Sequence, residues 1–405
     1  MSVKELLKMH GKPEREIYFD IENSGFVPRE VVEAMLPYFN MVGYGNPAIT
    51  HKPGWEAYDA YFEAKSLFAR TINARPEEIV FTHSGTEANN LAIMGYYLAN
   101  KGRGKKIVSS IIEHGSVLFV LDHLKKHFGC MFQLVPVDEE GFVDPEIFES
   151  FIDGDTMLVS VQMVNHEIGT IQDIKALVEV AKDRNPDVIF HTDACDAYGR
   201  INIDVEKLGV DMLTVSSHKI LGPKGVGALF VREGIRLESP IRGQLSAEKL
   251  WPLVGNIPAV AGFRRAIELA FDSMDGNVRH MRTLRDMLMR GIVDSVDDVL
   301  INGPIGDRRV CDNLNVSFLY VEGEAVTVEL SMRGIYVSSG SACTSRYLEP
   351  SHVLIAIGRR HEEAHGSILF KVTRYHTIGD IEYTIRQIPE AIERLRKISS
   401  WKPER

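Results

Sequence analysis

The sequence predicts an α/β fold with a mostly parallel sheet about seven strands wide, helices on both faces, and a smaller α+β unit after it. Short apolar runs alternate with stretches of helical spacing over residues 79–231. Several runs are almost continuously apolar, which is typical of strands covered on both faces, and the intervening lengths suit helical crossovers. Ligands of such sheets bind beyond the carboxyl ends of the strands.

The expected elements follow in order along the chain. The strands of the large sheet are EIVFT, KKIVSSII, MFQLVPV, TMLVSVQMV, DVIFHTD, DMLTVSS and GALFVRE. A long amphipathic stretch over residues 257–294, in which Gly276 is taken as the internal breaker, predicts a helical bridge to the second unit. That unit has a strand at NLNVSFLY, a helix at GEAVTVELSMRG, a short strand at IYVSSG and a C-terminal helix over residues 378–398. We expect a large domain over residues 17–265 and a small one over residues 266–405 that includes residues 1–16.

Composition narrows the class of protein. The chain has 405 residues, of which 44% are hydrophobic and 25% charged, as in ordinary globular proteins. Its formal net charge of -10 argues against a direct nucleic-acid partner. The charged N-terminus lacks a signal peptide's apolar core, and no apolar run is long enough to span a membrane. The four cysteines are widely spread with no CxxC, so we expect neither a metal site nor a disulfide framework, and a cytoplasmic location.

The segment DMLTVSSHKILGPKGVGALFV carries the first candidate site. Ser216 and His218 flank Lys219 where a strand ends before a glycine-rich turn. A lysine at a strand end is usually a solvated surface residue. The hydroxyl and imidazole beside it nevertheless suit an anion such as phosphate, and a sheltered amine can lose its proton and form a Schiff base.

The second candidate site lies in the segment IVFTHSGTEANNLAIMG. Gly85 and Thr86 lie between a strand and a helix that we expect to open near Glu87. Backbone N–H groups at a helix start, with the Thr86 hydroxyl, can bind phosphate without a basic residue. A plain helix cap explains the same pattern, because Ser or Thr followed by Glu is the capping signature.

Two more strand ends carry ionisable side chains. Asp193 ends an apolar strand, where a buried carboxylate needs a cationic partner such as a protonated pyridine nitrogen, although a structural ion pair or a helix cap would also satisfy it. His114 could stack on a flat ring and move protons, or it could be a hydrogen-bonded surface residue. Together these residues offer a Schiff-base lysine, a phosphate site, a pyridinium partner and a ring-stacking group, which is the set that pyridoxal 5'-phosphate requires.

A family resemblance agrees with this set. SSHKILGPKGVGALFV, FTHSGTEANNLAI, VNHEIGTIQDI, GYGNPAITHKPG and SSGSACTSRYLEPSHVL follow in the order and spacing of the cysteine desulfurases. These are fold-type I pyridoxal-phosphate enzymes of the class V aminotransferase group, and the resemblance covers about residues 17–396. It implies that Lys219 holds the cofactor, Asp193 faces the pyridine nitrogen and His114 stacks on the ring. The phosphate would be held by Gly85, Thr86, Ser216 and His218.

The resemblance also accounts for Cys343, which lies among small polar residues in YVSSGSACTSRYLEPSHV. Cys343 would take the sulfur of L-cysteine as a persulfide, release alanine and pass the sulfur to an acceptor protein. Glycine and small polar residues permit the necessary motion of the loop at little steric cost. A buried inert cysteine is the alternative, but its neighbours have little apolar surface with which to bury it.

Several positions depart from the family pattern. His166 stands where the family has asparagine and Asp196 where it has glutamine, both beside the cofactor's phenolic oxygen, and we expect these two to hydrogen-bond each other. Leu369 replaces the arginine that binds the substrate carboxylate, Arg374 is not its equivalent, and Val254 lies near the usual phosphate-binding Thr or Ser. The early DYAATTP has become DIENSGFVP.

Because of these departures from the family pattern, three functions remain possible for the chain. The first is a divergent cysteine desulfurase, active as a homodimer because GYGNPAITHKPG resembles the family's crossover segment. The second is a related C–S lyase or a desulfurase for another sulfur compound. The third is a non-catalytic sulfur carrier.

Overall fold

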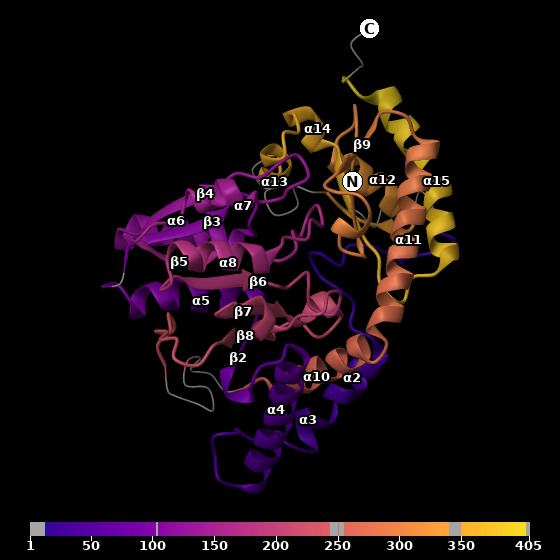
Figure 1. Ribbon diagram of the computed structural model, residues 1–405. Helices are drawn as coiled ribbons and strands as arrows, with labels where there is room; N and C mark the ends of the chain where they lie inside the picture. The colour runs from indigo at the N-terminus through magenta and orange to yellow at the C-terminus, as the bar shows by residue number, and fades with distance from the viewer. Residues whose placement is uncertain (1–12, 103, 244–249, 251–254, 340–349, 402–405) are drawn as a thin grey trace.

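In the computed structural model, two sheets are joined by long helices (Figure 1). The structure describes residues 13–102, 104–243, 250, 255–339 and 350–401. Every run expected for the large sheet forms a strand: β2 (Ile79–Thr82), β3 (Lys106–Ser110), β4 (Met131–Val135), β5 (Thr156–Ser160), β6 (Ile189–Asp193), β7 (Met212–Ser216) and β8 (Gly227–Val231). Their order is β2-β8-β7-β6-β5-β3-β4, and only β8 runs opposite to its neighbours. The mostly parallel, seven-stranded sheet is therefore confirmed.

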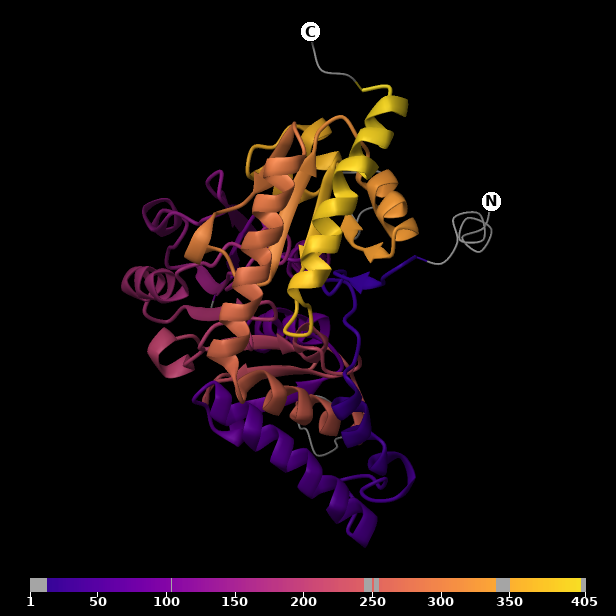
Figure 2. The same ribbon diagram turned by 90° about the vertical axis from the view of Figure 1, so that its right-hand side faces the viewer.

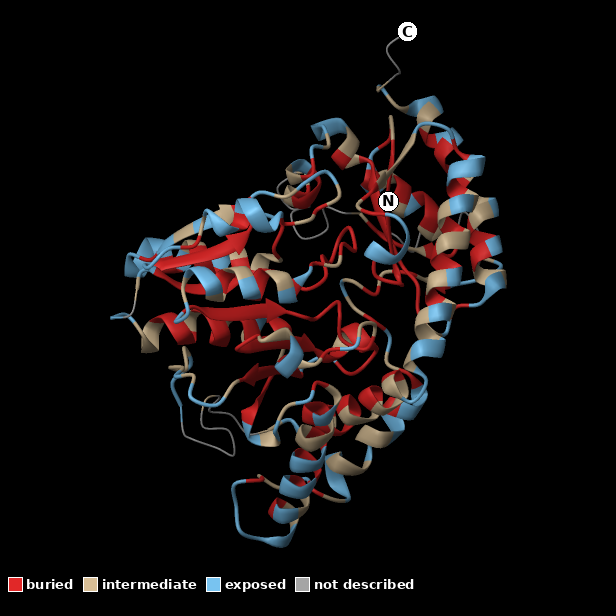
Figure 3. Cartoon of the chain, viewed as in Figure 1, coloured by how far each residue is buried: buried red, intermediate tan, exposed pale blue. Residues whose placement is uncertain are grey.

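Six of the seven strands are buried at every position because helices cover both faces, whereas the edge strand β4 is fully buried only at Val135. Along β2, for instance, Ile79 and Phe81 join one core and Val80 the other. The core around Val80 is closed by α5 (Gly85–Ala99) and α6 (Gly115–Phe128). The opposite core is closed by α4 (Lys52–Thr71), α8 (Ile174–Arg184) and α10 (Ile257–Phe271). Figure 3 shows the resulting buried layer in red. The shorter helices of this part are α2 (Arg29–Met35), α3 (Pro37–Asn40), α7 (Pro145–Glu149) and α9 (Val205–Leu208).

The second sheet is smaller and antiparallel, with the order β12-β13-β10-β9. Its strands are β9 (Val299–Asn302), β10 (Asn313–Phe318), β12 (Ser338–Ser339) and β13 (Ser367–Lys371). The helices of this part are α11 (Met274–Ser295), α12 (Gly323–Met332), α13 (His352–Ala356), α14 (His361–His365) and α15 (Ile378–Ile398). The helices α11 and α15 lie side by side (Figure 2).

The bridge between the sheets differs from the expected single stretch. It breaks at Asp272 and Ser273, between α10 and α11, whereas Gly276 lies inside α11. A glycine near a helix start can be accommodated, since it lowers stability without preventing helix formation. The domain boundary expected at residues 265 and 266 falls inside α10 and stays a prediction.

A short N-terminal segment connects the second sheet to the first. The strand β1 (Ile17–Tyr18) pairs in parallel with β11 (Ile335–Tyr336), and the Lys371 backbone N–H donates to Phe19 O at 3.0 Å. The chain then turns over residues 21–23. This pairing brings Glu22 into contact with Lys371, the last residue of β13, and with Lys219, three residues after β7. Among the described helices, none is both long and apolar enough to cross a bilayer.

Candidate active site

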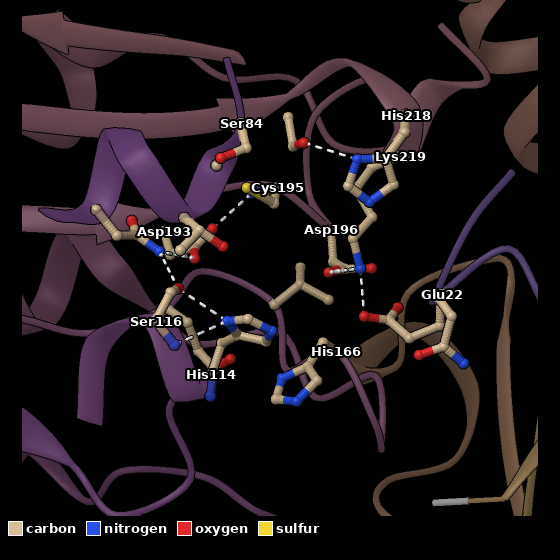
Figure 4. Close-up of a pocket in the computed structure, with 17 residues that line it drawn as sticks. Glu22, Ser84, His114, Ser116, His166, Asp193, Cys195, Asp196, His218 and Lys219 are labelled. Carbon is tan, nitrogen blue, oxygen red and sulfur yellow. Dashed lines mark hydrogen bonds and ion pairs between the residues drawn. The ribbon is translucent and has the colours of Figure 1, made fainter. Parts of the chain in front are cut away.

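The candidate site is a cavity of about 250 Å³ at the carboxyl ends of the parallel strands (Figure 4). Its lining contains all nine of the described residues that the sequence pointed to, namely Gly85, Thr86, His114, His166, Asp193, Asp196, Ser216, His218 and Lys219. Cys343 and Val254 lie outside the described residues. The sheet topology explains the gathering, because parallel strands end at one edge and their loops meet there.

The sequence left two interpretations of the helix start at Gly85, a phosphate-binding site and a plain helix cap, and the structure is compatible with both at once. Ser84 is the N-cap of α5, and its hydroxyl accepts the Glu87 N–H at 3.1 Å, so the capping interpretation is confirmed. The helix begins at Gly85, two residues earlier than expected. A Cβ at Gly85 would come within 2.8 Å of Cys195 Sγ and 3.2 Å of Ser216 Cβ. Only glycine fits at that spot, so the start of α5 packs closely against Cys195 and Ser216 while Gly85 and Thr86 line the cavity.

His218 and Ser216 face this helix start from β7 and the short 3-10 turn η2 (Ser217–Ile220). His218 Nδ1 and Ser216 Oγ are 2.9 Å apart. Burial, reinforced by the nearby Lys219 ammonium, lowers the pKa of His218 to about 4. His218 is therefore a neutral hydrogen-bonding group at neutral pH, not a cation.

Asp193 belongs to a hydrogen-bond chain that also orients His114. Asn89 Nδ2 donates to Asp193 Oδ2 at 2.7 Å and to Ser116 Oγ at 2.8 Å. Ser116 Oγ lies 2.8 Å from His114 Nδ1, and the Ser116 backbone N–H donates to the same nitrogen at 3.1 Å, which makes His114 the N-cap of α6. The sequence analysis missed Asn89 and Ser116. Asn89 could have been found as a polar residue on the buried face of α5.

His166 does not form the hydrogen bond with Asp196 that the sequence analysis expected. His166 Nδ1 is buried without a hydrogen-bond partner, and its ring lies edge-on to His114 with centroids 5.1 Å apart. Burial and the neighbouring His114 and Lys219 hold the pKa of His166 well below its usual range, so the ring is neutral. The expectation was wrong because a lysine remote in sequence pairs with Asp196 instead.

The lysine that pairs with Asp196 is Lys371, at the end of β13. The site contains two lysines and two carboxylates in a closed arrangement. Lys219 Nζ contacts Glu22 Oε1 and lies 3.1 Å from Asp196 Oδ2. Lys371 Nζ contacts Asp196 Oδ1 and lies 3.0 Å from Glu22 Oε2. The four side chains are between 1% and 11% exposed, so these are buried charges.

The electrostatics of the four groups follow from this closure. Burial alone would raise the pKa of Asp196, but Lys219, Lys371 and Arg200 outweigh it and hold this pKa well below its usual range. Burial alone would lower the pKa of Lys219, but Asp196 and Glu22 raise it above the ordinary lysine value. Sequence reasoning missed Glu22 and Lys371. A lone lysine at the end of the apolar strand SILFK is the signal that could have found the latter, since lysine is almost never buried unpaired.

A hydrogen bond from Arg200 holds the backbone of Lys219 in place. Arg200 Nη2 donates to Lys219 O at 2.9 Å, and Arg200 Nε donates to the buried Asp312 at 2.6 Å. The short turn η2 is followed by Leu221, whose φ of 67° lies in the left-handed region and ends the turn. The Lys219 amine is thus directed into the cavity beside Asp196 and Glu22, as Figure 4 shows.

Comparison with known proteins decides the family. The model of the class V aminotransferases matches residues 17–383. A relative from Archaeoglobus fulgidus, cysteine desulfurase IscS 1, is 43% identical over 382 residues, covering 94% of this chain and 98% of the relative. The chain belongs to the cysteine desulfurases of the class V aminotransferase family.

Solved structures agree with this family membership. A NifS-like protein superposes with a TM-score of 0.87 at 32% identity, covering 94% of this chain and 100% of that protein. SspA in complex with cysteine superposes with a TM-score of 0.77 at 30% identity, covering 89% and 99%. The resemblance noted in the sequence is therefore confirmed, and with it the fold-type I architecture.

The cofactor of this desulfurase-family chain is pyridoxal 5'-phosphate, and the residues present fit it. Because position 85 is glycine, the start of α5 lies close against Cys195 and Ser216, and Gly85, Thr86 and Ser216 all line the cavity in which the phosphate would bind. The unpartnered His166 Nδ1 offers one further hydrogen bond in the same cavity.

Proposed function

We propose that this chain removes the sulfur of L-cysteine, holds it as a persulfide on Cys343 and releases alanine. One observation supports this most strongly: the Lys219 amine, Asp193, His114 and the open helix start at Gly85 line a single cavity. Bound there, pyridoxal phosphate supplies a carbonyl carbon for the amine and a ring that withdraws electrons. SspA, a solved relative, has been captured with cysteine.

The residues of this chain have distinct parts in the proposal. Lys219 holds the cofactor and then moves protons, and Asp193 keeps the ring nitrogen protonated. His114 covers the ring in an orientation set by Ser116. The phosphate binds at the start of α5, between Gly85, Thr86, Ser216 and His218, where backbone N–H groups and the helix dipole favour an anion.

The described residues that follow Cys343 in the chain lie close to His114, which supports the persulfide role. The chain re-enters the described region at Pro350, and Ser351 Oγ donates to Glu167 Oε2 at 2.5 Å. His352 Nε2 lies 2.9 Å from Glu113 O, next to His114. Cys343 itself lies outside the described residues, eight positions before Ser351 in the sequence.

Product analysis tests the proposal. The protein supplied with cysteine should form alanine and a persulfide on Cys343, and borohydride should fix the cofactor on Lys219. The variant Cys343→Ala should lose the persulfide yet keep the spectrum of the bound cofactor. A protein that binds no cofactor, or that forms no alanine from cysteine, would refute it.

One observation favours a second candidate, a C–S lyase or a desulfurase for another sulfur compound. Leu369 is 2% exposed within β13, and among the described residues that line the cavity there is no arginine. Arg374 lines a separate small hollow behind Lys219. Glu22, Asp193 and Asp196 instead give the cavity three carboxylates. Release of pyruvate and ammonia without a loop persulfide would identify a lyase.

We propose that the active form is a homodimer that passes sulfur to an acceptor protein in the cytoplasm. An apolar surface supports the dimer: Leu36, Phe39, Met41, Tyr44, Ile49, Trp55, Tyr58 and Phe62 are each 42–76% exposed over α2, α3 and α4 and the loop before α4. Monomeric proteins rarely expose so many large apolar side chains together. Light scattering should give about twice the chain mass of 45.5 kDa, and Trp55→Glu should lower it.

A further inference from the structure

Two carboxylates that the family pattern does not include face the reactive lysine. Glu22 stands in the segment DIENSG and Asp196 in DACDAYG, and both line the cavity. In Figure 4 their oxygens meet the Lys219 amine from two directions. Lys371 contacts both carboxylates but does not line the cavity. It lies behind them, at 1% exposure.

We propose that Glu22 and Asp196, backed by Lys371, form a charge clamp that receives the amino group of Lys219 each time a substrate amine displaces it from the cofactor. Glu22 is the positioning residue of this clamp. The inference rests on the proposed function, because it assigns a task to a residue of the same reaction. It explains why the chain holds two buried acids next to the one amine that must be released and recaptured.

The exchange balances in atoms and charge. The nitrogen of the substrate's ammonium would form a double bond to the cofactor carbon while the double bond from that carbon to the protonated Lys219 nitrogen breaks. Both electron pairs of the broken double bond stay on Nζ and bind the two protons that the substrate nitrogen sheds, so Nζ becomes an ammonium and the charge is conserved. No oxidant or reductant is needed. The new ammonium then has two carboxylates within contact distance.

Charge counting shows why the clamp prefers a cation at that position. The clamp and Lys219 together carry two negative and two positive charges, so the buried cluster is neutral only when the Lys219 nitrogen is charged. A neutral amine would leave one uncompensated negative charge out of water, which is unfavourable. The clamp therefore holds the displaced lysine as an ammonium beside the reacting atoms, ready to return a proton.

The other groups that face Lys219 do not change this count. His166 and His218 are neutral, because burial lowers the pKa of each. Burial raises the pKa of the Cys195 thiol well above its usual range, so it is neutral too. Arg200 is balanced by Asp312.

A pH titration of the loaded enzyme tests the clamp without measuring activity. The visible absorbance of the cofactor bound to Lys219 reports whether the linking nitrogen carries a proton. Opposite charges in contact shift such equilibria by about 1–3 pH units. Glu22→Gln should move the midpoint down by that amount, and Lys371→Met should move it up, because it leaves the two acids unbalanced. The control Glu16→Gln makes the same chemical change at an exposed site and should leave the midpoint unchanged.

A second measurement follows the displaced lysine directly. With the loaded enzyme saturated by alanine, the arylation of Lys219 by fluorodinitrobenzene is followed by peptide mass spectrometry. Only a neutral amine reacts, so Glu22→Gln should raise the rate about tenfold or more, in line with a shift of at least one pH unit. Asp196→Asn makes the same prediction and serves if Glu22→Gln does not fold.

The outcomes separate the clamp from the proposed function. An unchanged midpoint or an unchanged arylation rate in a folded, cofactor-loaded Glu22→Gln protein would overturn the clamp and leave the desulfurase reaction standing. The same holds if Lys371→Met moves the midpoint downward. A wild-type protein that never develops the visible band would instead remove the proposed function, and the clamp with it.

Discussion

The coupling between Glu22 and Lys371 can be measured as a stability cycle. Their charged atoms are 3.0 Å apart and their side chains are 11% and 1% exposed. At this separation two unit charges attract by about 5.5 kcal/mol at an effective dielectric constant of about 20. Desolvation offsets part of this, and couplings measured between contacting residues reach about 0.5–3 kcal/mol. We therefore expect a coupling of about 2–3 kcal/mol in this buried cluster.

The cycle compares Glu22→Gln, Lys371→Met and the double variant. Each single change leaves one uncompensated buried charge and should lower the free energy of unfolding by about 3–5 kcal/mol. The double variant keeps the neutral Lys219–Asp196 pair, so its loss should be smaller than the sum of the two single losses by the coupling energy. Urea titrations of cofactor-free protein, followed by circular dichroism and tryptophan fluorescence, measure all three. Strict additivity would refute the view that the four charges form one balanced cluster.

Three further predictions concern the cofactor site and the pH dependence of stability. The variant Asn89→Ala removes the amide that donates a charge-assisted hydrogen bond to Asp193, and such a bond contributes about 1.5–3 kcal/mol. The affinity for the cofactor, measured by fluorescence titration, should therefore fall about 10-fold to 150-fold. An unchanged affinity would contradict this role of Asn89. Gly85→Ala should weaken phosphate binding at least about tenfold because its Cβ meets a sulfur atom at 2.8 Å, whereas Gly102→Ala, with no heavy atom within 4 Å, should leave it intact. Burial lowers the pKa of His191 to about 4 in the folded protein, whereas the unfolded chain has the ordinary value of about 6.5. As the pH falls between these two values, His191 is protonated in the unfolded chain and stays neutral in the folded one, which favours unfolding. Stability should drop there by about 1.4 kcal/mol per pH unit for this one group, and His191→Gln should flatten the slope; an identical slope in both proteins would exclude His191 as its source.

The sequence by itself determined the architecture of the large sheet. Seven apolar runs became seven strands, because a strand buried on both faces must be apolar at nearly every position. It also determined which strand-end residues meet, since parallel strands place their carboxyl ends at one edge. Lys219, Asp193 and His114 could be grouped on that topological ground alone.

Only the tertiary structure decided how the charges in the site are balanced. Glu22 and Lys371 are 349 positions apart in the chain, in two segments whose local patterns predict nothing about each other. They meet because β1 pairs with β11 and the backbone of β13 bonds to Phe19, which brings the turn at Glu22 over the end of β7. The expected His166–Asp196 hydrogen bond does not form because the same long-range packing brings Lys371 to Asp196. A buried carboxylate binds the strongest cation within contact distance, and which cation that is depends on long-range packing that residue spacing does not encode.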